Sequence, residues 1–298
     1  MSKRLIVILL LIIIGFLGLF VLASKGDDQS EQALLRPVES FQHAHGLAVD
    51  VGNSDQVYIA THNGLFMLQN DTELYQVGSK TDDFMGFSLH PTDPNTIYTS
   101  GHPKTGGNIG FQSTTDGGRI WERVSNGTNG PVDFHALAVS HANPETIYGW
   151  YAGNLQRSTN AGKEWRILDT GLEGVISLST HPTEAATVYA ATTNGIQKSE
   201  NQGGTWSSTA SDLEGTAVTV LAINPINASE WISFSEKLGL AKSSDAGQTW
   251  ERLDVGRSQE TILHVAYDPK NPATVYALSQ NDALFKTTDG GASWQQVR

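Results

Sequence analysis

The stretch Thr-Thr-Asp-Gly-Gly-Arg-Ile-Trp at residues 114–121 decides the fold, because the same phrase returns four more times along the chain. The further copies begin at Ser158, Ser199, Ser243 and Thr287, and each fits the pattern Ser/Thr-x-Asp/Asn-x-Gly-x-x-Trp. In such a phrase the acidic or amide side chain can bond the backbone of its own turn, the glycine can adopt positive φ, and the tryptophan re-enters a strand and packs. Five copies therefore predict a repeated strand-turn-strand unit.

A second phrase recurs six times: a short apolar strand, a turn rich in Asn, Asp and Pro, and a β-branched residue beside an aromatic one. The six copies begin at Gly46, Gly86, Ala136, Ser177, Leu221 and Val265. Their spacing of about forty residues is typical of a four-stranded propeller blade. We therefore expect an all-β fold, a β-propeller of six blades over residues 41–298. Seven blades is the alternative. Separately, residues 34–39 are a candidate closing strand for the last blade.

The first unit departs from the pattern. After its third strand, residues 69–73 contain neither the glycine nor the tryptophan of the repeated turn. This blade is expected to be degenerate or to carry a different turn.

The composition excludes several classes of function. The chain has 31 acidic and 19 basic side chains, for a formal charge of -12, which repels nucleic acid and anionic lipid headgroups. Cysteine is absent, which excludes disulfides, thiolate metal sites and cysteine nucleophiles. The 30 glycines and the low charged fraction of 17% favour short strands joined by tight turns.

The N-terminus predicts export. Lys3 and Arg4 precede an apolar run over residues 5–23, which is long enough for a helix that crosses a bilayer. This segment is expected to be either a retained membrane anchor or a signal peptide cleaved after Ala23. Residues 24–40 are expected to be a polar tether. The propeller would then lie outside the cytoplasm, touching the membrane through the N-terminal segment only, or be secreted after cleavage.

The repeated turn resembles the Asp-box, or bacterial neuraminidase repeat, which is shared by sialidases, sortilin-type receptors and photosystem-assembly propellers. The resemblance covers the chain from Phe41 to the C-terminus. It implies a propeller with the box between the third and fourth strands of each blade, and it implies no activity. Several phrases contain histidines outside the repeat consensus, among them His43-x-His45-Gly46-Leu47, Thr61-His62-x-Gly64-Leu65-Phe66, Ser100-Gly101-His102-Pro103 and Asp133-Phe134-His135. These phrases, with Met85-Gly86-Phe87, also look like a family of exported bacterial Asp-box proteins often labelled glycosyl hydrolases. That label implies no reaction.

Several histidines break the repeat at the entry to the first strand or in the loop after the second strand, positions that share one face of a propeller. With one methionine, they are our candidate metal ligands: His43, His45, His62, Met85, His102 and His135. Residues two apart on a strand point the same way, so pairs from three adjacent blades should converge at the channel mouth. Imidazoles and a thioether without cysteine favour copper over zinc, and Asp83 and Asp133 would orient the rings.

The other histidines considered, His90, His141 and His181, occupy a shared turn position and are expected on the opposite face. The structural alternative for the cluster is a polar channel lining of hydrogen-bonded histidines and aspartates with Met85 packed beside them.

Two further functions stay open. A glycosidase would need a pair of acids at one mouth, for which Asp83 and Asp133 are the candidates. Tyr151 and Glu236, at loop positions of the third and fifth units, could join them. A sialidase would need three arginines, and only Arg36 and Arg257 are placed to approach the mouth. The third function is a scaffold that grips another exported protein. The partner is thus a small ligand, a metal ion or an exported protein, and no nucleic acid.

Overall fold

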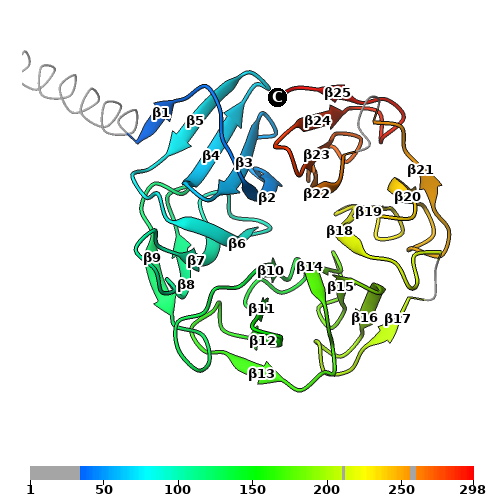
Figure 1. The fold of residues 1–298 in the computed structure, drawn as a ribbon, viewed down its shortest axis with the longest axis horizontal. Helices are drawn as coiled ribbons and strands as arrows, with labels where there is room; N and C mark the ends of the chain where they lie inside the picture. Colours follow the sequence, from blue (N-terminus) through cyan, green and yellow to red (C-terminus); the bar gives the residue numbers. More distant parts are fainter. Residues whose placement is uncertain (1–33, 210–211, 256–259) are drawn as a thin grey trace, which may run out of the picture. The chain divides into compact units, whose positions relative to one another are not determined.

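The computed structural model describes residues 34–209, 212–255 and 260–298, and every regular element in them is a β-strand. From Pro37 onward the strands form a ring of six blades, each built on four antiparallel strands in chain order (Figure 1). None of the described segments is an apolar helix long enough to cross a membrane. The expected N-terminal hydrophobic helix lies outside the described residues.

Each blade begins with its innermost strand, and its four strands follow one another outward in chain order (Figure 1). The first blade contains β2 (Ala44–Val49), β3 (Gln56–Thr61), β4 (Gly64–Gln69) and β5 (Glu73–Val77). The second contains β6 (Asp83–Leu89), β7 (Ile97–His102), β8 (Phe111–Thr114) and β9 (Glu122–Ser125). The third contains β10 (Ala136–Val139), β11 (Ile147–Tyr151), β12 (Asn154–Ser158) and β13 (Arg166–Leu168).

The remaining three blades repeat this order. The fourth contains β14 (Val175–Thr180), β15 (Val188–Thr192), β16 (Gly195–Ser199) and β17 (Ser207–Ser208). The fifth contains β18 (Val218–Ile223), β19 (Trp231–Ser235), β20 (Gly239–Ser243) and β21 (Glu251–Arg252). The sixth contains β22 (Ile262–Tyr267), β23 (Val275–Ser279), β24 (Leu284–Thr287) and β25 (Gln295–Gln296).

The prediction of six blades is confirmed, and both the seven-blade alternative and the closing strand for the last blade are wrong. The short strand β1 (Leu35–Pro37) belongs to the sheet of the first blade, at the edge next to β5. Val38 continues this pairing, since its backbone N–H donates to the carbonyl of Leu74 at 2.9 Å. The last blade needs no borrowed strand, because β25 pairs with β24.

The repeated turn lies between the third and fourth strands and is held by its own side chains. In the fifth blade Asp245 Oδ1 accepts from the backbone of Gln248 at 3.0 Å and of Thr249 at 2.9 Å. Hydrogen bonds from Thr249 lower the pKa of Asp245 to about 2. Trp250 Nε1 donates to the carbonyl of Gly247 at 3.0 Å, so the indole lies half-buried over the turn. These bonds give the repeated phrase a structural role.

The first blade carries a different turn, as expected. Asn70 and Asp71 both have positive φ, at 51° and 61°, and Gln69 pairs with Glu73 across them. Asn and Asp tolerate this conformation better than other non-glycine residues. The hairpin between β4 and β5 therefore closes without the box.

The hydrophobic core lies between adjacent blades. The seam between the last and the first blade buries Ile59 and Leu68 against Leu278 and Leu284. Asp71 adds polar contacts across the same seam, accepting from the hydroxyl of Tyr276 at 2.8 Å and from Lys286 Nζ at 2.6 Å. The ring is therefore closed by side chains rather than by a shared strand.

Candidate metal centre

A β-bulge near the beginning of the innermost strand shapes the site. The pairing of β2 with β3 skips His45, and the pairing of β6 with β7 skips Met85. His135 is in the equivalent position of the third blade, just before β10, where its N–H donates to the carbonyl of Trp150 at 2.9 Å. A bulge breaks the two-residue alternation of a strand. The regular alternation is therefore interrupted at His45 and Met85, although the rings of His43 and His45 both lie beside the ring of His62.

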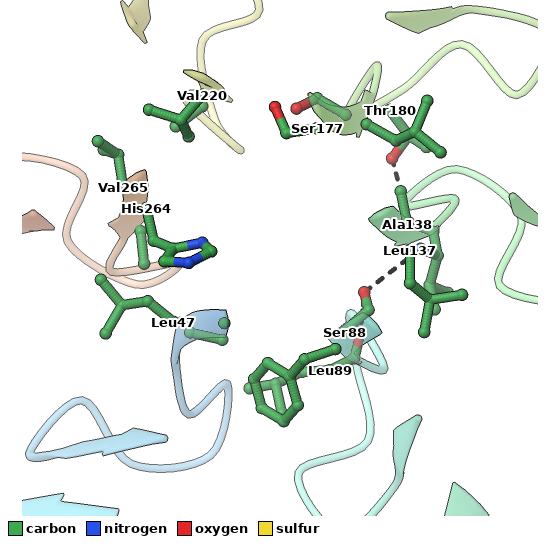
Figure 2. Close-up of a pocket in the computed structure, with 18 of the residues that line it drawn as sticks. Leu47, Ser88, Leu89, Leu137, Ala138, Ser177, Thr180, Val220, His264 and Val265 are labelled. Atoms are coloured by element: carbon green, nitrogen blue, oxygen red, sulfur yellow. Dashed lines mark hydrogen bonds between the residues drawn. The ribbon is translucent and has the colours of Figure 1, made fainter. Parts of the chain in front are cut away.

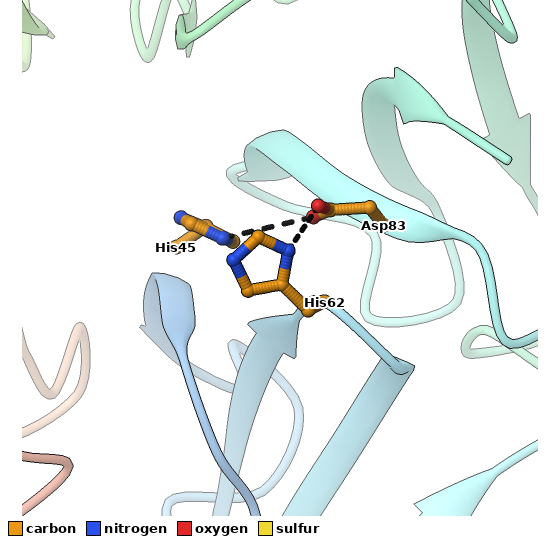
Figure 3. Close-up of side chains that lie close together, drawn as sticks. All are labelled: His45, His62 and Asp83. Carbon is orange, nitrogen blue, oxygen red and sulfur yellow. Dashed lines mark hydrogen bonds and ion pairs between the residues drawn. The ribbon is translucent and has the colours of Figure 1, made fainter. Parts of the chain in front are cut away.

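His45, His62 and Asp83 form the centre of the cluster (Figure 3). His45 comes from β2, His62 follows β3, and Asp83 begins β6 of the next blade. One ligand atom of each lies within 4.8 Å of the other two. His45 Nε2 is 3.6 Å from Asp83 Oδ1, and His62 Nδ1 contacts Asp83 Oδ2. The three groups converge on one point between the first two blades.

Two atoms of this group are buried without a hydrogen-bond partner. They are His45 Nε2 and Asp83 Oδ1. The Asp83 residue as a whole is only 3% exposed, so water has little access to its carboxylate. Buried polar atoms are nearly always paired, and an unpaired one is costly where water is excluded. The arrangement thus leaves room for a group that binds both atoms.

A metal ion fits between these atoms. Bonds of about 2.0–2.2 Å to nitrogen and oxygen place neighbouring ligand atoms of a tetrahedral site roughly 3.4 Å apart. The 3.6 Å from His45 Nε2 to Asp83 Oδ1 is close to this separation. Three protein ligands leave the fourth position of a tetrahedral ion open, as in catalytic zinc sites. The group could therefore hold a metal ion and still bind an external ligand.

The other predicted residues surround this group at different distances. His102 Nε2 is 3.4 Å from Asp83 Oδ2, and the ring of His43 lies 5.2 Å from that of His62 between centroids. Met85 lines the channel together with His45 and His135. Asp83 was expected only to orient the rings, whereas here it offers an oxygen to the group itself.

Asp133 and His135 form a neighbouring pair. Asp133 Oδ2 is 3.3 Å from His135 Nε2, while Asp133 Oδ1 is buried without a partner. The hydrogen bond with Asp133 raises the pKa of His135. Burial lowers the pKa of His45, against the opposing effect of the Asp83 carboxylate. The imidazole of His45 is thus kept neutral, the form that coordinates a metal.

One channel histidine, His264, was not among the residues expected from the sequence. The His264 ring projects into the channel from β22 of the last blade (Figure 2). Burial, with a contribution from His45, lowers its pKa to about 4, against a hydrogen bond to the backbone of Ala44. In the strand register His264 corresponds to Gly46 and not to His45, because the bulge residue of the last blade is Leu263. No repeat of the histidine pattern therefore marked His264 in the sequence.

The last blade also fixes the strand that presents His45. The carboxylate of Asp282, in the turn between β23 and β24, accepts from the backbone of His43 at 2.9 Å and of Ala44 at 3.1 Å. His264 binds the backbone of Ala44 as well. Ring closure therefore positions the site.

The turn histidines are placed as expected. His90 Nδ1 accepts from the backbone of Thr92 at 3.3 Å and of Asp93 at 3.0 Å. His181 caps its turn in the same way, at 3.3 and 3.1 Å. His141 lies at the corresponding turn, where its Nδ1 is 3.3 Å from Thr180 Oγ1. These histidines serve the turns.

The candidate catalytic residues have different surroundings. The Tyr151 hydroxyl accepts from Asn108 Nδ2 at 2.9 Å, and Glu236 is exposed in the corresponding loop of the fifth blade. Asp83 and Asp133 each contact histidines instead. Arg257, a candidate for the sialidase arginines, lies outside the described residues.

Comparison with solved structures finds related folds at low sequence identity. A GH74 enzyme of Niastella koreensis is 17% identical, with a TM-score of 0.63 over 88% of this chain and 46% of its own. An auxiliary nutrient binding protein of Bacteroides thetaiotaomicron is 13% identical, with a TM-score of 0.61 over 87% of this chain and 70% of its own. YCF48 bound to D1 peptide is 16% identical, with a TM-score of 0.56 over 88% and 84%.

The shared fold is a β-propeller. Identities this low establish the fold alone. The chain spans about half the length of the GH74 structure, 46%. No protein-family model matches the sequence, and no curated protein matches it.

Proposed function

We propose that this propeller binds a divalent transition metal ion through His45, His62 and Asp83, with His102 beside them. One observation carries the proposal: His45 Nε2 and Asp83 Oδ1 are buried, unpaired and 3.6 Å apart. Two imidazoles and a carboxylate from two neighbouring blades supply the donors. A merely structural network would be expected to pair these atoms with each other.

Copper is the metal we propose. Imidazole donors suit Zn²⁺, Cu²⁺, Ni²⁺ and Fe²⁺, and among divalent ions of the first row Cu²⁺ binds a given nitrogen and oxygen site most tightly. Met85 at the channel rim provides a thioether near the site. The carboxylate of Asp83 also suits Zn²⁺, so a direct comparison of the two ions is part of the test.

The metal site is favoured over the glycosidase and the scaffold. An acid pair for glycoside hydrolysis needs two carboxyl groups that face the sugar. Asp83 is instead buried against His45, His62 and His102. A scaffold gives no reason for buried unpaired atoms at the channel mouth. Sugar turnover, or a protein that co-purifies without metal, would favour these alternatives.

Titration of the purified full-length chain with Cu²⁺ and Zn²⁺ tests the proposal. We expect one equivalent of either ion to bind, with Cu²⁺ bound more tightly than Zn²⁺. The His45→Ala, His62→Ala double variant should lose roughly 100-fold or more in metal affinity. This exceeds the 10–100-fold loss that is typical when a residue that only hydrogen-bonds a metal ligand is removed. Binding should weaken from pH 7.5 to pH 5, because the imidazoles must lose their protons to coordinate.

The matched control is His90→Asn, which replaces a turn histidine with the residue that the fifth blade has at this turn, Asn224. Its metal affinity should equal that of the unmodified protein. If the double variant binds metal as well as this control does, the cluster is a polar channel lining and the proposal is wrong.

We further propose that the propeller acts outside the cytoplasm, as in the exported Asp-box proteins that its repeats resemble. The apolar run over residues 5–23 supports this location, and no cysteine is present for a lipid anchor. Cell fractionation should find the protein in the membrane fraction, with its C-terminus accessible to protease from outside the cytoplasm. Recovery of the intact chain from the cytoplasm would contradict the proposal.

A further inference from the structure

The proposed metal site opens into the central channel of the propeller. His45 belongs both to the group that could hold the ion and to the channel lining. The channel has a volume of about 280 Å³ and reaches His90 and His141 near its other end. For scale, an enclosed apolar cavity of about 150 Å³ accepts benzene. A small organic molecule can therefore lie next to the metal site.

Apolar side chains line the channel between the histidines, beside polar groups that make up a similar share of the wall (Figure 2). Every blade contributes an apolar residue from its innermost strand: Leu47, Phe87, Leu137, Leu178, Val220 and Val265. Two hydroxyls are already engaged, because Ser88 accepts from the backbone of Val139 and Thr180 donates to it. The Ser177 hydroxyl also faces the channel and is buried without a partner. Such a wall suits an aliphatic or aromatic group.

The channel mouth is chemically divided. The bulge of the innermost strand holds His45 in the first blade and Met85 in the second, and His135 occupies the equivalent position of the third blade. In the last three blades the bulge holds Ile176, Thr219 and Leu263. Of these last three residues Ile176 lines the channel, together with His264 of the last blade, so a ligand meets His45, Met85 and His135 on one side and Ile176 and His264 on the other.

The net charge of the metal-loaded site indicates which chemical group of a ligand would bind the metal ion. A divalent ion bound by two neutral imidazoles and the Asp83 carboxylate leaves a net charge of about +1, by the donor types of such sites. A monoanion at the open position would neutralise this charge. A carboxylate is the simplest oxygen donor of that charge.

We infer that the site binds a monocarboxylate with an apolar tail, its carboxylate on the open position of the metal ion and its tail in the channel. This inference rests on the proposed metal site. The tail would displace water from the wall formed by the innermost strands, and so its length should determine affinity. With its carboxylate on the metal ion, such a ligand would extend its tail into the channel.

Calorimetric titration of the Zn²⁺-loaded full chain with butanoate, hexanoate and octanoate tests the inference. Each added methylene should lower Kd by up to about fourfold until the tail fills the channel. This factor corresponds to about 0.8 kcal/mol for each methylene that is buried. Ser177→Phe should abolish this dependence on chain length, because the ring would fill the channel. Ser177→Ala is the matched control and should keep the dependence.

The same titrations separate the two proposals. Both variants should bind Zn²⁺ like the unmodified protein, which also shows that they are folded. Metal-free protein should bind octanoate at least tenfold more weakly than the loaded protein. If Zn²⁺ binds but octanoate binds no more tightly than butanoate, the inference is wrong while the metal site stands. If neither Zn²⁺ nor Cu²⁺ binds, both are wrong.

Discussion

Replacing Trp231 by alanine should lower the free energy of unfolding by about 3–5 kcal/mol, the cost typical for removing a large buried aromatic side chain. Trp231 is 1% exposed and packs edge-on against Tyr189, with ring centroids 4.9 Å apart. Its Nε1 donates to the carbonyl of Ala228 at 2.7 Å. The alanine variant would leave a cavity in the seam between the fourth and fifth blades. Urea unfolding followed by circular dichroism measures the loss.

Trp294→Ala is the matched control, because this tryptophan belongs to a repeated turn and is only half-buried. Its Nε1 donates to the carbonyl of Gly291 at 3.1 Å, so its removal costs that hydrogen bond and part of an apolar surface. We expect a smaller loss than for Trp231. Equal losses in the two variants would show that the turns, and not the seams between blades, dominate stability.

The fold was predictable because the information is local. Each repeated turn is specified within eight residues, as for Ser243 to Trp250, whose side chains bond their own backbone. The closure of the ring was not predictable in the same way. It depends on contacts such as Asp71 with Lys286, separated by 215 residues, for which no local pattern exists.

The site was predictable in position and less so in geometry. Equivalent places in adjacent blades correctly brought His45 and His62 together with Asp83. The bulge at His45 could not be foreseen, because period-two alternation assumes a regular strand. His264 was missed because the first and last blades are far apart in sequence, although they are neighbours in the closed ring.

Asp83→Asn should reduce the affinity for Cu²⁺ and Zn²⁺ by roughly 100-fold or more, above the 10–100-fold expected when only an outer partner is lost. Asparagine has nearly the same shape but no charge, and a neutral amide oxygen is a poor ligand for these ions. Asp83 contacts His62 and lies 3.6 Å from His45 and 3.4 Å from His102. Metal titration at pH 7.5 gives the affinity, and urea unfolding of the metal-free protein gives the stability.

The combination of the two measurements decides what Asp83 does. If it is a metal ligand, affinity falls while the stability of the metal-free protein changes by less than about 1 kcal/mol, because the isosteric amide can still bond the histidines. If the cluster is only a polar lining, removing the charge weakens the contacts with the histidines and lowers stability, while the small residual metal binding stays the same. Unchanged affinity together with lost stability would therefore reject the metal site at the residue on which it most depends.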